Sequence, residues 1–186
     1  MRAKHDETWQ ADLARYPKGP WLKEQSIWAI GVYRFGRRVA ARRPGMWTRL
    51  LWTTYWLAQR VVETLTGISF LYTVEIGGGL RIWHFGNIFI HPQVRIGRNC
   101  TLRQGVTIGN RVEGGPVPVI GNDVDFGAYS QVLGGIRVGD GARLGAMAVV
   151  LNDVPEGATA VGNPARVIEC SGRSESARRE AEVSQQ

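Results

Sequence analysis

The sequence contains only two cysteines, Cys100 and Cys170, among 186 residues. A single disulfide cannot staple a chain of this size, and so few cysteines are typical of a protein with reduced thiols that folds around a hydrophobic core. Residues 1–15 are polar throughout and show no secretory signal peptide. We therefore expect a cytoplasmic protein with one compact domain and appendages.

A hydrophobic run long enough to cross a bilayer is also missing. The most apolar helical stretch, Met46 to Leu65, has only ten uncharged residues between Arg49 and Arg60, whereas a spanning helix needs about 20 apolar residues. Further arginines lie near its start: Arg37, Arg38, Arg42, Arg43 and Arg49. Two interpretations stay open, a helical cap packed on the rest of the chain and peripheral contact with the anionic inner face of a membrane.

Acidic residues are scarce in the N-terminal part of the chain. The net charge is +7; residues 1–75 hold 12 Lys+Arg against 6 Asp+Glu, and residues 76–168 hold 8 against 6. No recognised nucleic-acid-binding motif accompanies the clustered arginines, so we expect no nucleic-acid partner.

Residues 169–186 are charged and lack an apolar pattern, which predicts a disordered tail.

The sequence does contain a six-residue period between Ile76 and Pro155. An apolar residue opens each of twelve blocks: Ile76, Ile82, Ile90, Ile96, Leu102, Ile108, Ile120, Phe126, Val132, Val138, Leu144 and Val150. This period fits neither an amphipathic helix nor a hairpin meander. It fits a solenoid in which each block is a short strand plus a corner, with the opener pointing inward. Two interruptions, Ile88-Phe89 and 113–119, fall between blocks.

As a class, these repeats resemble the hexapeptide-repeat transferases. The resemblance implies a mainly β chain that folds as a left-handed parallel β-helix, with three blocks per coil and about four coils. We expect this β-helix over residues 71–168, after an N-terminal α-helical region at 1–70 and before the tail at 169–186. Within the helical region, helices are expected over Thr8–Ala14, Trp21–Val39 and Met46–Leu65.

One histidine stands where it could do chemistry. His5 lies in the polar leader, and His91 occupies a second position, which predicts a surface corner. His84 is the third residue of its block, and stacking the blocks by threes puts it at one end of a column. The rest of that column is Gln104, Ala128 and Ala146. Coils rise by about 4.8 Å each, so a base followed by small residues would border a groove suited to a long, thin cofactor arm.

More specific motifs surround His84. The segments Gly79–Ile88, Gln104–Gly109 and Val161–Arg166 resemble the serine acetyltransferase family, and more closely its branch in polysaccharide-biosynthesis clusters. The resemblance covers about residues 68–168. It implies an acetyl-CoA-dependent O-acetyltransferase in which His84 is the general base. An imidazole can take the proton of an acceptor hydroxyl as its oxygen attacks the thioester, without an acyl-enzyme. No metal is expected.

The resemblance also implies which residues meet acetyl-CoA. The family's cofactor contacts carry over to Gly109, Asn110, Gly127, Ala128, Gly145, Ala146 and Arg166, the last as a partner for a phosphate. Repeat geometry alone would also explain the glycines and alanines. The resemblance further implies a homotrimer with sites between neighbouring subunits, and higher assembly through the N-terminal helices stays open.

The sequence departs from the family where an amino-acid acceptor would bind. Ser69, Trp83 and Val117-Pro118 stand at positions where charged groups are expected. A buried zwitterion without charged partners is costly, so we expect a saccharide or lipid-linked saccharide that stacks on Trp83 or Phe85. Serine O-acetylation for cysteine synthesis is the alternative, with Asp12 swinging in as a charged partner. A non-catalytic scaffold is a third interpretation, from another class.

Overall fold

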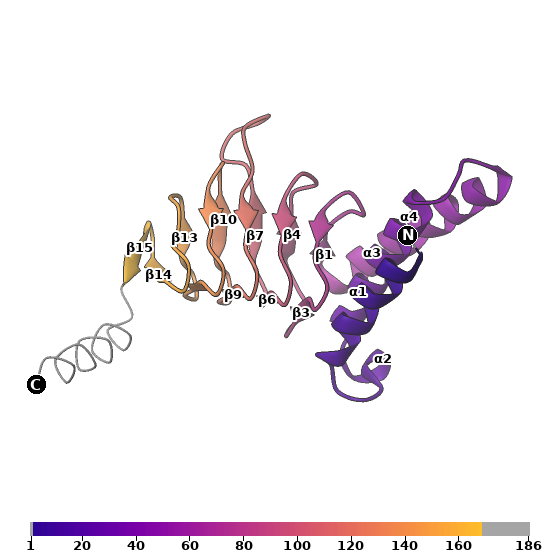
Figure 1. Cartoon of the computed structure of the whole chain (residues 1–186), viewed down its shortest axis with the longest axis horizontal. Helices are drawn as coiled ribbons and strands as arrows, with labels where there is room; N and C mark the ends of the chain where they lie inside the picture. Colours follow the sequence, from indigo (N-terminus) through magenta and orange to yellow (C-terminus); the bar gives the residue numbers. More distant parts are fainter. Residues whose placement is uncertain (1, 169–186) are drawn as a thin grey trace, which may run out of the picture.

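The computed structural model describes residues 2–168, with side chains from residue 7 onward. The expected disordered tail and Cys170 lie outside these residues. The described chain forms a prism of stacked coils with helices packed on one end (Figure 1). The helices are α1 (Arg2–Ala14), α2 (Pro20–Lys23), α3 (Ser26–Ala40) and α4 (Met46–Thr66).

Three sheets form the faces of the prism. The first face consists of β1 (Ile68–Ser69), β4 (Ile88–Ile90), β7 (Thr107–Gly109), β10 (Gln131–Leu133) and β13 (Val149–Val150). The second consists of β2 (Glu75–Ile76), β5 (Arg95–Ile96), β8 (Val119–Ile120) and β11 (Arg137–Val138). The third consists of β3 (Arg81–Ile82), β6 (Thr101–Leu102), β9 (Asp125–Phe126), β12 (Arg143–Leu144), β14 (Thr159–Gly162) and β15 (Ala165–Ile168).

Neighbouring strands within a face come from successive coils. They pair in parallel, with the exception of the antiparallel β14–β15 hairpin. Block openers pair with openers, as Ile76 does with Ile96 and Ile90 with Ile108. Four complete coils run from β2 to β13. The expected parallel β-helix of about four coils with N-terminal helices is therefore confirmed.

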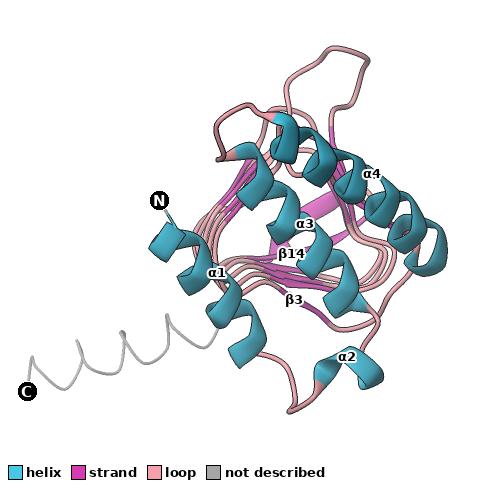
Figure 2. Ribbon diagram, turned by 90° about the vertical axis from the view of Figure 1, so that its right-hand side faces the viewer, coloured by secondary structure: helices cyan, strands magenta, loops and turns pink. Residues whose placement is uncertain are grey.

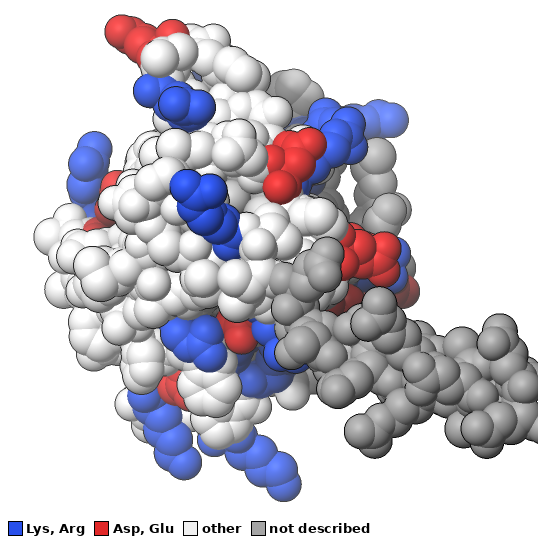
Figure 3. Space-filling view, turned by 90° about the vertical axis from the view of Figure 1, so that its left-hand side faces the viewer, with Lys and Arg blue, Asp and Glu red and all other residues white. Residues whose placement is uncertain are grey.

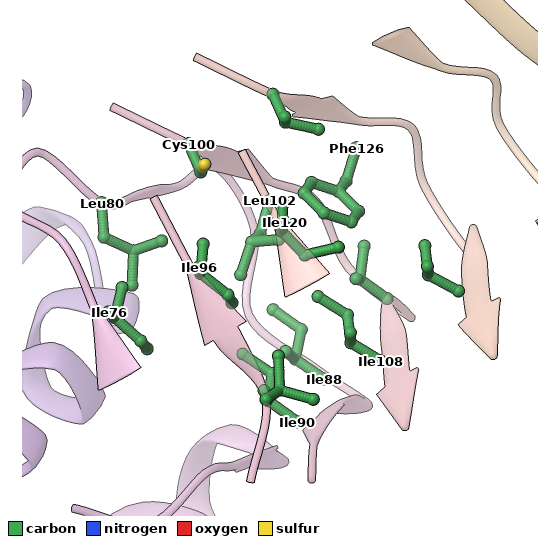
Figure 4. Close-up of a cluster of buried hydrophobic side chains, with 14 of the residues drawn as sticks. Ile76, Leu80, Ile88, Ile90, Ile96, Cys100, Leu102, Ile108, Ile120 and Phe126 are labelled. Atoms are coloured by element: carbon green, nitrogen blue, oxygen red, sulfur yellow. The ribbon is translucent and has the colours of Figure 1, made fainter. Parts of the chain in front are cut away.

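The openers fill the interior of the prism together with the small residues at fifth positions (Figure 4). Phe126, Leu102 and Cys100 are all fully buried, and burial of such apolar surface stabilises the fold by roughly 25 cal/mol per Å². The corners are equally tight. A Cβ added at Gly77 would lie 2.7 Å from the carbonyl oxygen of Gly97 in the next coil, which explains why glycine so often follows the opener.

The first interruption of the repeat lies at a different place from the one expected. Ile88 and Phe89 pair regularly within β4. The backbone N–H of Trp83 donates to Leu102 and that of Gly105 donates to Gly86, each over 3.0 Å. Trp83 is thus level with residue 103 and Gly86 with residue 104, which leaves residues 84 and 85 as the two extra ones. A corner has no strand ladder to break, so it accommodates an insertion that a strand would not.

The helical region also differs from expectation in one respect. The single helix expected over Trp21–Val39 is divided into α2 and α3 at Glu24 and Gln25. The division has a physical cause, because both sides of it bind the solenoid. The carboxylate of Glu24 pairs with Arg81 at 2.7 Å, and the hydroxyl of Ser26 donates to the Ile82 carbonyl at 2.8 Å. Helix α4 ends at Gly67 in the left-handed conformation, φ 65°, as expected.

Helices α1 and α3 lie against the end of the prism (Figure 2), and a buried ion pair between them holds both on the first coil. Arg34 Nε donates to Asp12 Oδ2 at 2.8 Å, and Asp12 Oδ1 accepts the backbone N–H groups of Gly79 and Leu80 at 2.9 and 2.8 Å. Arg34 also donates to the Ile76 carbonyl. The Asp12 carboxylate is fully buried. This placement contradicts the expectation that Asp12 contacts the acceptor, because both its oxygens already bind protein.

Replacement of Asp12 by alanine should destabilise the protein by about 3–5 kcal/mol, because it leaves the Arg34 guanidinium buried without its counter-ion. Urea unfolding followed by circular dichroism measures the loss. Glu113→Ala, at an exposed loop position, is the matched control and should change stability little. Equal unfolding midpoints for the Asp12 variant and the wild type would contradict this role.

Candidate active site

His84 lies on the enlarged corner after β3. Its side chain is exposed, and within residues 7–168 it makes no hydrogen bond. The neighbouring Trp83 and Phe85 are each 51% exposed. Gly86, with φ 111°, turns the chain back towards β4, a conformation that favours glycine. The corner thus presents an imidazole to solvent beside two half-exposed aromatic side chains.

The column of small residues expected beside His84 is present with one change. Backbone hydrogen bonds of 2.8 Å between successive coils place Gln104, Ala128 and Ala146 one above another. In the first coil, Gly86 occupies this column, because the two extra residues precede it. His84 therefore projects outward next to the column and does not stack within it.

Side chains from the helical region hold the strand that leads to His84. Strand β3 is at the edge of its sheet, so the outer backbone groups of Ile82 have no neighbouring strand. The Ile82 N–H donates to the Tyr16 hydroxyl at 3.1 Å, and the Ile82 carbonyl accepts from Ser26 at 2.8 Å. Burial raises the pKa of Tyr16, so its hydroxyl stays protonated. These contacts satisfy the edge and fix the position from which His84 projects.

Arg81 fixes the aromatic ring next to His84. Its side chain is 4% exposed, and its guanidinium lies 3.9 Å from the centroid of the Tyr16 ring and 4.5 Å from that of Trp83. Its Nη2 also pairs with Glu24. Cation–π contacts of desolvated arginines are strong, so the indole is held in place. The roles of Arg81, Glu24 and Ser26 were not predicted from the sequence, where no motif distinguishes them.

The residues expected to bind acetyl-CoA fall into three groups in a single chain. Gly127, Ala128, Gly145 and Ala146 follow β9 and β12 at the corner that contains His84. Gly109 and Asn110 lie at the far end of β7, where the loop over residues 110–118 leaves the prism (Figure 1). Arg166 lies exposed on β15 at the C-terminal end. One chain does not bring these groups together, since the first face separates His84 from Gly109.

The corner beside His84 has the shape that a thin ligand arm needs. A Cβ at Gly145 would lie 2.8 Å from Val161 Cγ1, and one at Gly127 would meet the backbone of Ala146. Stacking therefore requires both glycines whether or not a ligand binds. The methyl groups of Ala128 and Ala146 are what keep the surface next to the base narrow and apolar, which fits a pantetheine arm.

The other candidate groups are engaged elsewhere. His91 is half-buried, and its Nδ1 accepts the backbone N–H of Gln93 at 3.3 Å within its own turn. Burial raises the pKa of the Cys100 thiol to about 11, so it is protonated at neutral pH and cannot act as a nucleophile. Across the described side chains, no group of three His, Cys, Asp or Glu residues could hold a metal ion.

Comparison with known proteins identifies the family. The serine acetyltransferase of Helicobacter pylori (strain ATCC 700392 / 26695) is 38% identical over 144 residues, 76% of this chain and 80% of the relative. That of Bacillus subtilis (strain 168) is 37% identical over 154 residues, 82% of this chain and 68% of the relative. The chain belongs to the serine acetyltransferase family. No protein-family model matches it.

Solved structures of the family agree with this assignment. Soybean serine acetyltransferase superposes with a TM-score of 0.76 at 27% identity, over 89% of this chain and 69% of that one. The Neisseria gonorrhoeae serine acetyltransferase in complex with serine gives 0.74 at 27% identity, over 90% and 70%. A serine acetyltransferase complex with CoA gives 0.69 at 30% identity, over 87% and 66%. The expected acetyl-CoA-dependent acyltransferase class is thereby confirmed.

Substitution of His84 by alanine should lower kcat by about 10²–10⁴-fold, the usual contribution of a general base. The far-ultraviolet circular dichroism spectrum should be unchanged, because the side chain is exposed and packs against no core residue. His91→Ala is the matched control and should retain activity. Equal losses at both histidines, or none at His84, would contradict the assignment.

Proposed function

We propose that this family member transfers the acetyl group of acetyl-CoA to the hydroxyl of L-serine. The observation that carries the proposal is the 38% identity to a serine acetyltransferase over four-fifths of that relative's length. The structure of a relative in complex with serine, which shares this fold over 90% of the chain, supports the same acceptor. Serine therefore takes precedence over the saccharide expected from the sequence.

His84 performs the proton transfers in this proposal. Acetyl-CoA supplies the acetyl group as an activated thioester. The imidazole of His84 takes the proton of the acceptor hydroxyl as the oxygen forms its bond to the acetyl carbon, and returns that proton to the departing sulfur. Backbone N–H groups at the glycine-containing corners can stabilise the developing oxyanion.

An ion pair one coil away from Trp83 offers partners for both charges of serine. Arg103 Nη1 lies 2.7 Å from Asp125 Oδ1, and the two side chains are 37% and 43% exposed. Arg103 follows β6 at the level of Trp83. A partly exposed pair is weakly bound, so a zwitterion can exchange with it, its carboxylate meeting Arg103 and its ammonium meeting Asp125. The sequence did not reveal this pair, because the charged serine-binding groups were expected at the positions of Ser69, Trp83 and Val117-Pro118.

An assay of O-acetylserine formation tests the acceptor. We expect serine to be turned over, and Arg103→Gln to raise the KM for serine at least about tenfold, since charge-assisted hydrogen bonds to a ligand contribute roughly 1.5–3 kcal/mol. The KM for acetyl-CoA should be unchanged. Arg137→Gln, at an exposed position on β11 of the second face, is the control. A wild-type enzyme that ignores millimolar serine would overturn the proposal.

A saccharide is the second candidate acceptor, favoured by the aromatic pair alone. Trp83 and Phe85 border His84, each half-exposed, and Arg81 fixes the Trp83 ring. Exposed, rigid aromatic rings are suited to stacking against a sugar. The same assay decides between the two classes when nucleotide sugars replace serine. Turnover of a sugar at least about tenfold above that of serine, lost in Trp83→Ala, would favour the saccharide.

We also propose that the active form is a homotrimer with each site between two subunits. In one chain, the His84 corner and the Gly109–Asn110 corner lie at opposite ends of the first face. A closed ring brings one corner of a subunit next to the other corner of its neighbour. The groups that a single chain separates would then border one groove.

Coexpression of two inactive variants tests the shared site. His84→Ala removes the base, and Asn110→Trp obstructs the opposite corner of the groove. Random mixing of the two chains should restore about a quarter of the wild-type activity, because about a quarter of the interfaces pair two intact corners. Each variant alone should stay inactive. No recovery from mixed trimers, or full activity from a monomer in light scattering, would contradict the proposal.

A further inference from the structure

Helix α4 carries an apolar stripe that no part of the described chain covers. The exposed large side chains on it are Met46, Trp47, Leu50, Trp56, Leu57, Val61 and Leu65. Trp47 is 74% exposed, Leu57 68% and Leu65 62%. Apart from Trp56, they recur at helical spacing and lie on one side of the helix. Such a continuous apolar surface is unusual on a protein face that meets only water.

The opposite side of α4 does the packing that the fold needs. Tyr55 is fully buried, and its hydroxyl accepts the backbone N–H of Tyr72 at 3.2 Å. The Gln59 amide donates to the Phe70 carbonyl at 3.3 Å, and Thr66 is buried at the end of the helix. Figure 2 shows α4 lying across the end of the prism beside α3. The outer stripe is therefore not explained by the stability of this fold.

The charges around the stripe are predominantly positive. Between residues 37 and 66 there are six arginines and a single acidic residue, Glu63. Arg49 and Arg60 are exposed and lie eleven residues apart, three helical turns, so they border the stripe along the same side. Arg42 and Arg43 are exposed in the turn before the helix. On the C-terminal end of the prism, in contrast, charges of both signs are interspersed (Figure 3).

This combination favours a membrane surface over a second copy of the chain. Two such faces in contact would gather the arginines of both chains with only Glu63 of each chain to offset them, which is unfavourable. An anionic bilayer supplies the complementary charge and an apolar layer below it, so the arginines can stay at the headgroups while the stripe is buried. No helix in residues 2–168 is long and apolar enough to span a bilayer.

We propose that α4 binds in the plane of an anionic membrane surface. Trp47, Leu57 and Leu65 enter the boundary between headgroups and acyl chains, while Arg49 and Arg60 bind lipid phosphates. The enzyme would then carry out its acetyl transfer next to a membrane. Membrane binding does not depend on which acceptor the enzyme uses, because binding of the protein to vesicles is measured without acetyl transfer.

Flotation of the full-length protein with phospholipid vesicles tests the proposal. The protein should bind vesicles containing about 30% phosphatidylglycerol at least about tenfold more tightly than pure phosphatidylcholine vesicles. Raising the salt to about 0.5 M should weaken binding, because it screens the arginines. Failure of the wild-type protein to bind the anionic vesicles at low salt would overturn the proposal.

Paired substitutions separate the stripe from adventitious contacts. Leu57→Gln with Val61→Gln should lower the vesicle partition coefficient at least about tenfold, because each removes apolar side-chain burial in the interface. Leu22→Gln is the matched control, since Leu22 is 98% exposed on α2 and outside the stripe. Arg49→Gln with Arg60→Gln should weaken binding and its salt dependence, whereas Arg137→Gln, exposed on β11, should not.

Light scattering of the same variants tests the alternative partner of the stripe, a second copy of the chain. Under the proposal, Leu57→Gln with Val61→Gln leaves the molar mass in solution unchanged while vesicle binding is lost. A lower molar mass for this variant, with vesicle binding intact, would show that the stripe is an interface between copies of the chain. That result would overturn the membrane assignment, as would equal losses of binding in the stripe variant and in Leu22→Gln.

Discussion

The backbone hydrogen bonds between successive coils are the constraint on which the rest of this structure depends. Each strand is only two to four residues long, so a strand is stable only because a neighbouring coil pairs with it in register. Extra residues are tolerated only at corners, and this chain places two of them, His84 and Phe85, at the corner after β3. The rigidity of the ladder is thus what allows one enlarged corner to present a base at a defined position.

A solenoid also exposes unpaired backbone groups at its first coil, and the helical region satisfies them. The Tyr33 hydroxyl and the Arg34 guanidinium bind backbone groups around Ile76 at the edge of the second face. Tyr16 and Ser26 do the same for Ile82 on the third face. The same contacts serve stability and function, because β3 is the edge strand of its sheet and also the strand that leads to His84. The helices act on the site by holding this strand.

The six-residue period was enough to predict the coils and their inward positions. Features that depend on contacts of single side chains could not be predicted from the sequence. The openers from Ile76 to Val150 defined the coils, because inward positions in a stacked solenoid must recur at a fixed interval. The position of the insertion was wrong, since spacing alone cannot say whether extra residues precede or follow a strand. Asp12 was misassigned and Arg81 overlooked, because a charged residue reads as exposed until its partner, distant in sequence, is known.

The central claim is that acetyl transfer takes place at the enlarged corner, along the column below it. A crystal structure of the protein with CoA tests this most directly. We expect the CoA thiol within hydrogen-bond reach of the His84 imidazole, about 3 Å, because a general base must lie that close to the group whose proton it transfers. The pantetheine arm should lie along Ala128 and Ala146, with Gly109 and Asn110 of the neighbouring subunit on its other side. A thiol bound away from His84, or an arm held entirely within one subunit, would contradict the account.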